Sequence, residues 1–284
     1  MRFVPMADLL QHAASEGYAV PAFCVWNAET MVAVLQSAEK LKAPVIMMSG
    51  PSEFAVMGPA DMGAVAQTVA RRFNSTRAAL HLDHGDSLEL VDACLAAGYS
   101  SVMLDFSTRP VDENAEALRR VVAMAHPLNV TVEGELGTIG RVGQTTVEGN
   151  GQSTLTDPDV AASFVKGTQI DALAVSIGNA HGMYTTLPQL DFERLARLQA
   201  NVPAALVLHG GSGTPAEALR RAISLGITKV NVASELVDAL RQSLLNQWGA
   251  QQNLWVPLAQ AASIKAMAQV VEKWLRLTGA AGRA

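Results

Sequence analysis

The chain has 284 residues, of which 49% are hydrophobic and 17% charged, a balance typical of a globular protein with a well-filled core. The net charge of −5 gives no basis for binding to nucleic acid or to an anionic membrane, and no apolar run is long enough to span a bilayer. The first residues do not resemble a signal peptide, and two cysteines are too few for a disulfide framework, so we expect a protein of the reducing cytoplasm.

Strand-like and helix-like segments alternate along the chain. Short apolar runs, several of them rich in β-branched residues, predict strands, and longer segments with helical periodicity predict helices. The predicted strands are 19–25, 44–49, 78–83, 101–105, 130–135, 172–177, 204–209 and 227–232. The predicted helices between them are 29–41, 59–73, 88–97, 111–125, 158–166, 192–199 and 215–225. A helix at 5–16 precedes the first strand, and helices at 234–248 and 257–277 follow the last.

This order predicts an α/β protein with a (β/α)8 TIM barrel, extra terminal helices, and a single domain over residues 1–284. An open, doubly wound sheet is the alternative. Active sites of barrels lie at the carboxyl ends of the strands. The polar residues at these ends are Asp83, His84, Asp105, Glu135, His181, His209 and Asn231. The barrel therefore predicts that these side chains form one site.

Three of these strand ends carry a histidine followed by a glycine, at His84, His181 and His209. Neutral imidazoles bind zinc, and a catalytic zinc keeps three protein ligands and one open position. The histidines are far apart in the sequence, so only the fold brings them together. The pattern predicts one tightly held divalent ion, for which Zn²⁺ is the best match.

Asp83 and His84 are neighbours at the end of the third strand. Successive residues of a strand point to opposite faces, so the two side chains share a site only where the strand gives way to its loop. We expect Gly85 to turn the backbone there and Ser87 to cap the next helix. Asp83 then either exchanges protons with a substrate or orients a metal ligand. His81, two residues earlier, is expected deeper in the barrel.

Two further carboxylates, Asp105 and Glu135, end the fourth and fifth strands. They either hold a second divalent or monovalent cation, or a transient position of the first ion, or form an ordinary polar rim. After strand seven comes the turn Gly210-Gly211-Ser212-Gly213, and Asn231 to Ser234 follow strand eight. Many barrels bind phosphate at this place, through backbone N–H groups and a helix N-terminus.

The chain strongly resembles the class II, metal-dependent ketose-bisphosphate aldolases, which include the fructose- and tagatose-bisphosphate enzymes. The resemblance runs nearly end to end. It is carried by residues 81–85 (HLDHG), 101–105 (SVMLD), 133–137 (EGELG), 180–182 (AHG), 208–213 (LHGGSG) and 229–232 (KVNV).

The resemblance implies reversible cleavage of a ketose 1-phosphate or 1,6-bisphosphate to dihydroxyacetone phosphate and an aldehyde, through a zinc-stabilised enediolate. The expected zinc ligands are His84, His181 and His209, flanked by Asp105 and Glu135, and Asp83 is expected to exchange a proton with the C4 hydroxyl. The expected substrate and phosphate contacts are Gly182, Gly210, Gly211, Ser212, Asn231, Ser234 and, on the aldehyde side, Ser49. The resemblance also implies a homodimer or homotetramer.

Two departures from the family pattern stand out. The first strand ends in Phe23-Cys24, where the family often has Phe-Asn. The loop after strand five lacks the family's usual acid, because Val142 and Gly143 occupy its positions. Within the loop from 136 to 156 the one carboxylate is Glu148, so we predict that Glu148 protonates the enediolate. Glu133 or a metal-bound water is the competing proton source.

Two other functions compete with the zinc enzyme. Lys229 shares a strand face with Asn231, so a buried lysine could form a Schiff base with the substrate. That interpretation leaves the three histidines unexplained. The second competing function is that of a catalytically silent or regulatory paralogue of such an aldolase. The missing acid in the loop favours this interpretation, whereas the intact histidine triad and Asp83 oppose it.

Overall fold

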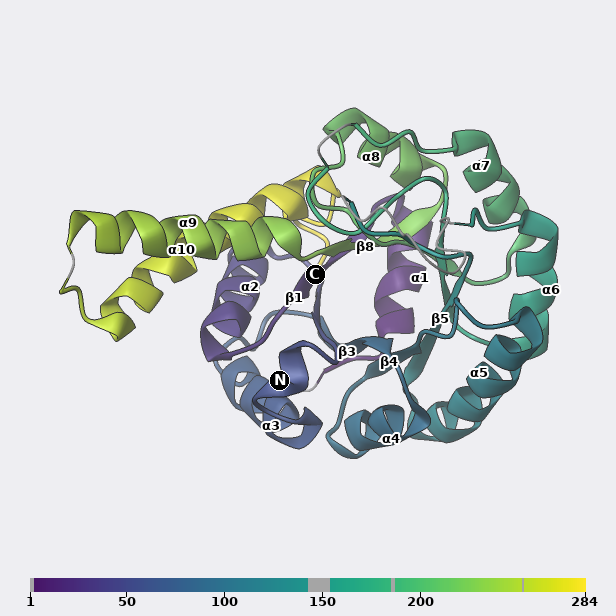
Figure 1. Ribbon diagram of the computed structural model, residues 1–284, viewed down its shortest axis with the longest axis horizontal. Coiled ribbons are helices and arrows are strands. Elements are labelled where there is room, and N and C mark those ends of the chain that lie inside the picture. Colours follow the sequence, from purple (N-terminus) through teal and green to yellow (C-terminus); the bar gives the residue numbers. More distant parts are fainter. Residues whose placement is uncertain (1–2, 143–153, 185–186, 252) are drawn as a thin grey trace.

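The computed structural model describes residues 3–142, 154–184, 187–251 and 253–284. Within these residues eight parallel strands close into a barrel in chain order (Figure 1). They are β1 (Val20–Cys24), β2 (Val45–Ser49), β3 (Ala78–Gly85), β4 (Ser101–Leu104), β5 (Thr131–Leu136), β6 (Ala172–Val175), β7 (Ala205–Leu208) and β8 (Ile227–Val232). The pairing of β1 with β8 closes the ring, so the predicted barrel is confirmed and the open sheet is wrong.

The α-helices that follow the strands form an outer ring around the barrel (Figure 1). They are α2 (Ala28–Leu41), α3 (Pro59–Ala70), α4 (Leu88–Ala96), α5 (Val111–Ala125), α6 (Pro158–Thr168), α7 (Phe192–Asn201) and α8 (Ala216–Ser224). Two short 3-10 helices, η1 (Glu53–Ala55) and η2 (His126–Leu128), were not predicted. Predicted and observed boundaries differ by a few residues, because helix ends depend on caps that periodicity does not detect.

Several of these helices begin at side-chain caps that the sequence supplies. The Asn27 side chain accepts from the Thr30 N–H, in a capping box at the start of α2. Ser87 Oγ accepts from the Leu90 N–H at 3.3 Å, as predicted for the start of α4. Because α4 starts soon after β3 ends at Gly85, this cap fixes where the short connection behind Asp83 and His84 must finish.

Helix α1 (Met6–Glu16) crosses the amino-terminal end of the barrel rather than joining the outer ring (Figure 1). Its apolar face, which includes Met6, Leu9 and Leu10, is fully buried. The Val4 N–H donates to the carbonyl of Ala78, at the start of β3. Helix α1 therefore covers this end of the barrel, and the carboxyl ends of the strands lie at the opposite end.

The strands are buried on both sides, as expected for a parallel sheet enclosed by helices. Their outer faces pack under the helices, and the barrel interior holds apolar side chains together with a few charged ones. His81, Glu133 and Lys229 are fully buried there. These polar residues lie below the barrel mouth, where the candidate site is built.

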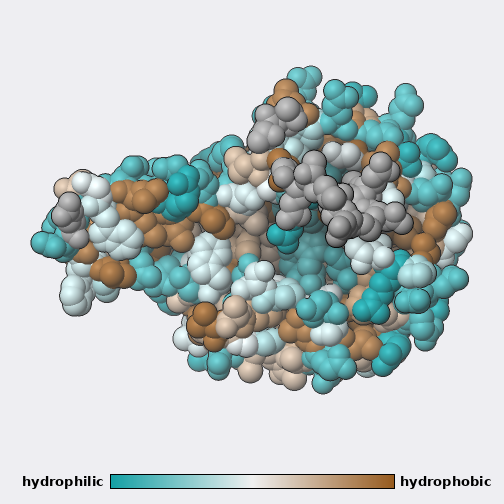
Figure 2. Space-filling view, in the orientation of Figure 1, coloured by the Kyte–Doolittle hydropathy of each residue, from teal (hydrophilic) through white to brown (hydrophobic). Residues whose placement is uncertain are grey.

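Helices α9 (Ser234–Ala250) and α10 (Val256–Leu277) form an antiparallel pair that projects from one side of the barrel (Figure 1). Apolar side chains gather on this arm (Figure 2). The exposed ones include Leu245, Trp255 and Leu258, with Trp255 72% exposed. An apolar surface of this kind on a projecting element is typical of a contact with another protein. None of the helices that the structure describes is both long and apolar enough to cross a bilayer.

Candidate metal centre and active site

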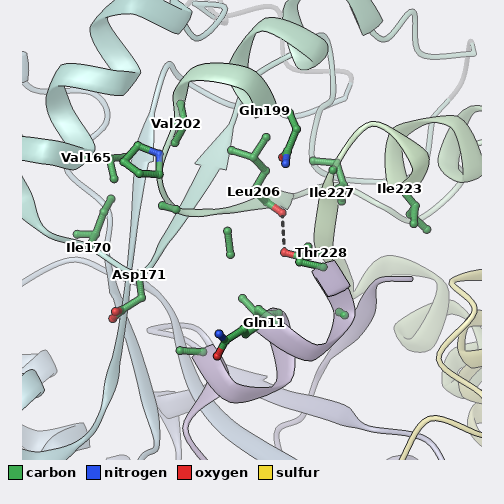
Figure 3. A pocket seen from close by; sticks show the side chains of 18 of the residues that line it. Gln11, Val165, Ile170, Asp171, Gln199, Val202, Leu206, Ile223, Ile227 and Thr228 are labelled. Carbon is green, nitrogen blue, oxygen red and sulfur yellow. Dashed lines mark hydrogen bonds between the residues drawn. The ribbon is translucent and has the colours of Figure 1, made fainter. Parts of the chain in front are cut away.

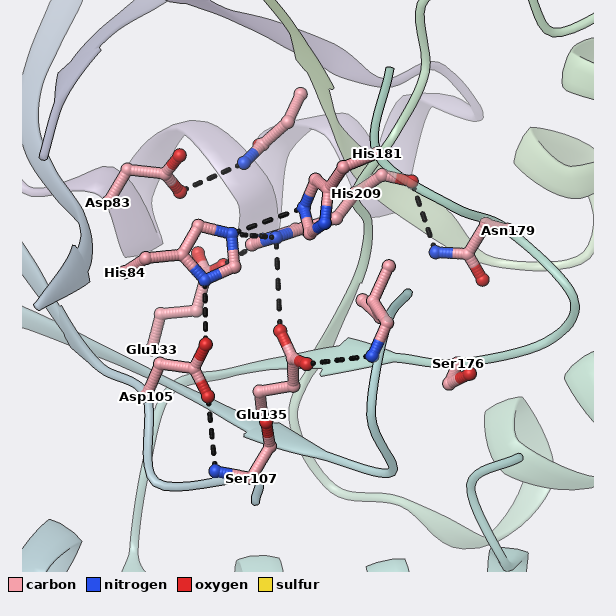
Figure 4. Close-up of polar contacts among 12 residues, drawn as sticks. Asp83, His84, Asp105, Ser107, Glu133, Glu135, Ser176, Asn179, His181 and His209 are labelled. Carbon is pink, nitrogen blue, oxygen red and sulfur yellow. Dashed lines mark hydrogen bonds and ion pairs between the residues drawn. The ribbon is translucent and has the colours of Figure 1, made fainter. Parts of the chain in front are cut away.

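The three predicted histidines meet at the carboxyl end of the barrel (Figure 4). Nε2 of His84 lies 3.2 Å from Nε2 of His181 and 3.0 Å from Nδ1 of His209. One ring nitrogen from each residue falls within a group whose members are all within 4.8 Å of one another. His84 comes from β3, and His181 and His209 follow β6 and β7. The fold therefore assembles a compact set of three imidazoles, which could hold a metal ion.

A bulge in β3 puts Asp83 and His84 into the same site. The register between β3 and β4 shifts between Leu82 and Gly85. His84 has a φ of +47°, in the left-handed region that non-glycine residues adopt at a cost of about 1–3 kcal/mol. The sequence predicted a turn at Gly85, but the turn falls at His84. Gly85 is needed for a different reason, because a Cβ there would lie 2.4 Å from the carbonyl oxygen of Met103.

In two of the histidines, the ring nitrogen that points away from the cluster, here called the outer nitrogen, contacts a carboxylate. The inner nitrogen of each is the one that points toward the other histidines. His84 Nδ1 lies 2.8 Å from Asp105 Oδ2, and His209 Nε2 lies 2.9 Å from Glu133 Oε1. Asp105 is itself fixed by the Ser107 N–H, at 3.0 Å from its Oδ1. A carboxylate on the outer nitrogen sets the tautomer of a metal-binding histidine, so that the inner nitrogen presents its lone pair.

The charges around the cluster shift the histidines in opposite directions. Burial alone would lower the pKa of His84, but Asp83, Asp105 and Glu135 outweigh it and raise that pKa to about 9. Burial and the charge of His84 lower the pKa of His181 to about 4, and the same two causes hold the pKa of His209 well below its usual value. The cluster thus favours one positive charge among three imidazoles, and a bound metal ion would take the place of the proton that supplies it.

Asp83 lies beside this cluster and is held by β8. Its Oδ1 accepts a hydrogen bond of 3.0 Å from Nδ2 of Asn231. Burial would raise the pKa of Asp83, but His84, His209 and Lys229 outweigh it and lower that pKa. Asp83 is therefore an ionised carboxylate at the barrel mouth, as acid–base chemistry requires. Oδ1 of Asn231 is buried and makes no hydrogen bond within the described part of the chain.

Glu135 and Asp105 form a second group with His84, again with atoms within 4.8 Å of one another. Burial and the Asp105 carboxylate raise the pKa of Glu135 to about 8. Its Oε2 is buried, lies 3.9 Å from His209 Nδ1, and makes no hydrogen bond to any residue that the structure describes. A buried carboxylate oxygen without a donor, next to three imidazoles, fits a bound cation.

The glycine turn after β7 lies where it was predicted, but Gly211 does not offer its amide. The Gly211 N–H donates to the carbonyl of Asn231 at 2.9 Å, so this amide is already used within the protein. The two leading glycines are also required for packing. At Gly210, which has a φ of +67°, a Cβ would lie 2.0 Å from the carbonyl oxygen of Ala180.

The other phosphate candidates are Ser234 at the start of α9, Ser212 beside it, and Gly182 after β6. Ser212 Oγ accepts from the Glu235 N–H at 3.2 Å, and Glu235 Oε1 accepts from the Gly213 N–H at 3.0 Å. The Ser212 N–H makes no hydrogen bond within the described residues, and Ser234 is the first residue of α9. Gly182, with a φ of +112°, directly follows His181. An amide, a hydroxyl and a helix N-terminus thus remain available for an anion.

Ser49 is not part of the barrel mouth. In the register of β2 with β3, Met48 pairs with His81 and Ser49 with Leu82. Since His81 points into the barrel, Ser49 points outward, where its hydroxyl lies 2.8 Å from that of Tyr99. The structure therefore does not bring the Ser49 side chain together with the histidine cluster.

The described parts of the loop after β5 run beside His181. The Val142 N–H donates to the His181 carbonyl, and the His181 N–H donates to that of Gly140, both at 2.8 Å. Where the loop returns toward α6, the carbonyl of Thr154 accepts a hydrogen bond of 3.1 Å from the Thr138 N–H. Glu148 itself lies outside the described residues.

Two charged residues that the sequence offers as alternatives, Glu133 and Lys229, pair with each other below the site. Glu133 was weighed as a proton source, yet it is fully buried and held by His209 and Lys229. Lys229 was weighed as a nucleophile, but its Nζ lies 3.1 and 2.9 Å from the two oxygens of Glu133. Strand alternation places both side chains inside the barrel, because each stands two residues before a residue at the barrel mouth, but it does not predict that they pair.

A cavity of about 720 Å³ lies at the opposite end of the barrel, between α1 and the starts of β7 and β8 (Figure 3). Its lining includes Gln11, Asp171, Gln199 and Thr228. Asp171 already accepts from the Val132 N–H at 2.7 Å. None of the residues predicted for catalysis lines this cavity, so the barrel mouth, where hydrophilic side chains surround a hollow (Figure 2), is the candidate active site.

Comparisons with known proteins agree with this geometry. A family profile for fructose-bisphosphate aldolase class-II matches residues 4–283. The YdjI aldolase of Escherichia coli K12 shares 33% identity, with a TM-score of 0.88 and 99% coverage of both chains. A putative fructose-1,6-biphosphate aldolase from Coccidioides immitis shares 29% identity, with a TM-score of 0.84 and coverage of 97% of this chain and 96% of that one.

The fructose-bisphosphate aldolase of Campylobacter jejuni, at 21% identity, has the same fold, with a TM-score of 0.82 and coverage of 100% of this chain and 97% of that one. The chain belongs to the class II fructose-bisphosphate aldolase family, and is an aldolase of the carbon–carbon lyase type.

Proposed function

We propose that the protein is a zinc-dependent aldolase that reversibly cleaves a phosphorylated ketose to dihydroxyacetone phosphate and an aldehyde. The observation that carries the proposal is the convergence of His84, His181 and His209 at the barrel mouth, with inner nitrogens 3.0 and 3.2 Å from that of His84. Three imidazoles and a free position are the ligand set of a catalytic zinc. Glu135 Oε2, buried without a donor among the described residues, supports a cation at the same place.

Zinc, when bound, supplies a Lewis acid that stabilises the negative charge left on the ketone half as the C–C bond breaks. Asp83 takes the proton of the C4 hydroxyl, and the electrons of the C3–C4 bond pass to C3 while the aldehyde leaves. Asn231 holds Asp83 through its amide, and its buried Oδ1 is placed to accept a hydrogen bond from a substrate hydroxyl. Glu148 returns a proton to C3 in this proposal.

The phosphate is proposed to bind between Ser212, Ser234 and Gly182, beside the turn formed by Gly210 and Gly211. The start of a 17-residue helix, α9, carries a partial positive charge and supports a dianion there. Asp105 and Glu135 are proposed to serve the same metal ion or a second divalent or monovalent cation. The exposed apolar side chains of the α9–α10 arm support a homodimer or homotetramer.

Condensation in the reverse direction tests the function. The purified protein with zinc is mixed with dihydroxyacetone phosphate and a panel of aldehydes, and C–C bond formation is followed by product analysis. We expect products with the phosphate and far lower efficiency with dihydroxyacetone. Equal efficiency with the two ketones would remove the phosphate assignment. No product with any aldehyde would favour the silent paralogue, whose intact histidine cluster would still bind zinc.

A further inference from the structure

Beneath the histidine cluster lies a group of polar side chains that the proposed chemistry does not use. His81, Ser101, Glu133 and Lys229 come from β3, β4, β5 and β8, and each is fully buried. Taking a lysine and a glutamate out of water is costly, and apolar residues of similar volume often serve folding at least as well. A buried ion pair directly below three imidazoles therefore needs an explanation beyond stability.

The ion pair crosses the barrel interior. Nζ of Lys229 lies 3.1 Å from Oε1 and 2.9 Å from Oε2 of Glu133, so the lysine contacts both carboxylate oxygens. Strands β5 and β8 are not neighbours in the barrel. In the barrel wall, backbone N–H groups are used by the strand ladders. Asp105, at a strand end, is held by a backbone N–H, whereas an interior carboxylate needs a side-chain donor, which Lys229 supplies.

The lysine also determines where the protons of this group lie. An ammonium group only donates, so His81 Nε2, at 3.5 Å from Nζ, is the acceptor. His81 Nδ1 then carries the proton and donates to Ser101 Oγ at 2.8 Å. On the other side, the Glu133 carboxylate only accepts, so His209 Nε2 donates to Oε1 at 2.9 Å. The lone pair of His209 Nδ1 is thereby left facing His84.

We propose that Glu133 and Lys229 are positioning residues for the metal centre, which hold His209 in the orientation and tautomer that turn its Nδ1 toward His84 and His181. This inference rests on the proposed function, because it assigns the pair a part in binding the zinc ion. His84 is oriented in the same way by Asp105. The two histidines differ in how their carboxylate partners are held. Asp105 accepts from a backbone N–H, whereas Glu133, in the barrel interior, depends on Lys229.

Paired substitutions test the inference without leaving a buried charge alone. Glu133→Leu with Lys229→Met removes the acceptor and the lysine together. Glu133→Gln with Lys229→Met removes both charges but keeps a carbonyl oxygen for the His209 N–H. Tyr99→Phe is the matched control, since it removes a buried hydrogen bond, to Ser49, on the outer side of β2. Circular dichroism of the metal-free proteins checks that each variant folds.

Zinc affinity is then measured by competition with a chromophoric chelator. We expect Glu133→Leu combined with Lys229→Met to weaken zinc binding about 10–100-fold, the range found when the outer partner of a metal ligand is lost. The double variant with Glu133→Gln should recover part of this loss, and Tyr99→Phe should bind zinc like the wild type. Unchanged zinc affinity in the folded double variant with Glu133→Leu would overturn the inference.

A measurement on the wild type makes the test independent of folding in the variants. Long-range ¹H–¹⁵N spectra of the zinc-loaded protein, labelled with ¹⁵N-histidine, should show His209 protonated at Nε2. A proton at Nδ1 of His209 would overturn the inference. Failure of the wild type to bind zinc at all would instead contradict the proposed function itself, and the inference with it.

Discussion

Asn231 and Asp83 face each other across the barrel mouth, where Nδ2 of the asparagine donates a hydrogen bond of 3.0 Å to Oδ1 of the aspartate. The two residues come from β8 and β3, which are not neighbours in the barrel. The contact fixes the direction of the carboxylate beside the histidine cluster. Held in this direction, the carboxylate is available for the separate acid–base role that we propose for Asp83.

Asp83→Asn is predicted to lose about 10²–10⁴-fold in the rate of C–C cleavage, the usual contribution of a general acid–base group. Zinc affinity should hardly change, because the three histidines remain. Steady-state kinetics and chelator competition measure the two quantities. Asp86→Asn, at an exposed position of the following turn, is the control and should keep wild-type activity. Wild-type turnover in Asp83→Asn would reduce Asp83 to an orienting role.

Gly210→Ala is predicted to destabilise the protein more than Gly17→Ala does. Both glycines have nearly the same backbone, with φ of +67° and +68°, so both variants carry the strain of about 1–2 kcal/mol that a left-handed residue pays. Only at Gly210 does the new Cβ clash, at 2.0 Å from the Ala180 carbonyl oxygen, whereas nothing lies within 4 Å at Gly17. Denaturant unfolding compares the two free energies, and equal losses would refute the packing role of Gly210.

Glu148→Gln is predicted to slow the exchange of the C3 proton of dihydroxyacetone phosphate with deuterated water, while binding of that ligand persists. The reason is that the family's usual loop positions hold Val142 and Gly143, which cannot carry a proton. Exchange is followed by NMR. Glu89→Gln, an exposed carboxylate at the start of α4, serves as the control. Exchange at the wild-type rate in Glu148→Gln would retire this role.

The apolar arm predicts an effect on assembly. Trp255→Ser combined with Leu258→Ser should reduce a wild-type oligomer to a smaller species, because these exposed side chains, 72% and 61% accessible, would lose their apolar contact. Size-exclusion chromatography with light scattering measures the mass. Leu128→Ser changes a leucine of similar exposure, 59%, on η2 and should leave the mass unchanged. A monomeric wild type would contradict the proposed oligomer.

The sequence was sufficient to predict the barrel and the histidine cluster for one reason. Each histidine ends an apolar strand, and parallel strands in a barrel bring their carboxyl ends to one face. The three residues are therefore neighbours whatever the details of the loops. Their distances, 3.0 and 3.2 Å between inner nitrogens, needed the structure.

Features that depend on register or on one backbone angle could not be predicted from the sequence. Ser49 ends a strand like the site residues, but a shift of one position decides which side of the barrel a side chain faces. At His84 the bulge interrupts the alternation of strand faces, so that this side chain faces the same site as its neighbour Asp83. The ion pair of Glu133 and Lys229 joins strands that are distant in the sequence. The alternation of side chains along each strand predicts that both residues face the barrel interior, but not that they contact each other.

Metal removal tests the central claim most directly. The protein is dialysed against a chelator, assayed for ketose cleavage, and assayed again after addition of zinc or cobalt, with borohydride treatment in the presence of substrate as a parallel sample. A zinc centre held by His84, His181 and His209 predicts loss of activity, its return with either metal, and no reduced adduct on Lys229. Full activity in the metal-free protein, with borohydride trapping of substrate on Lys229, would contradict it.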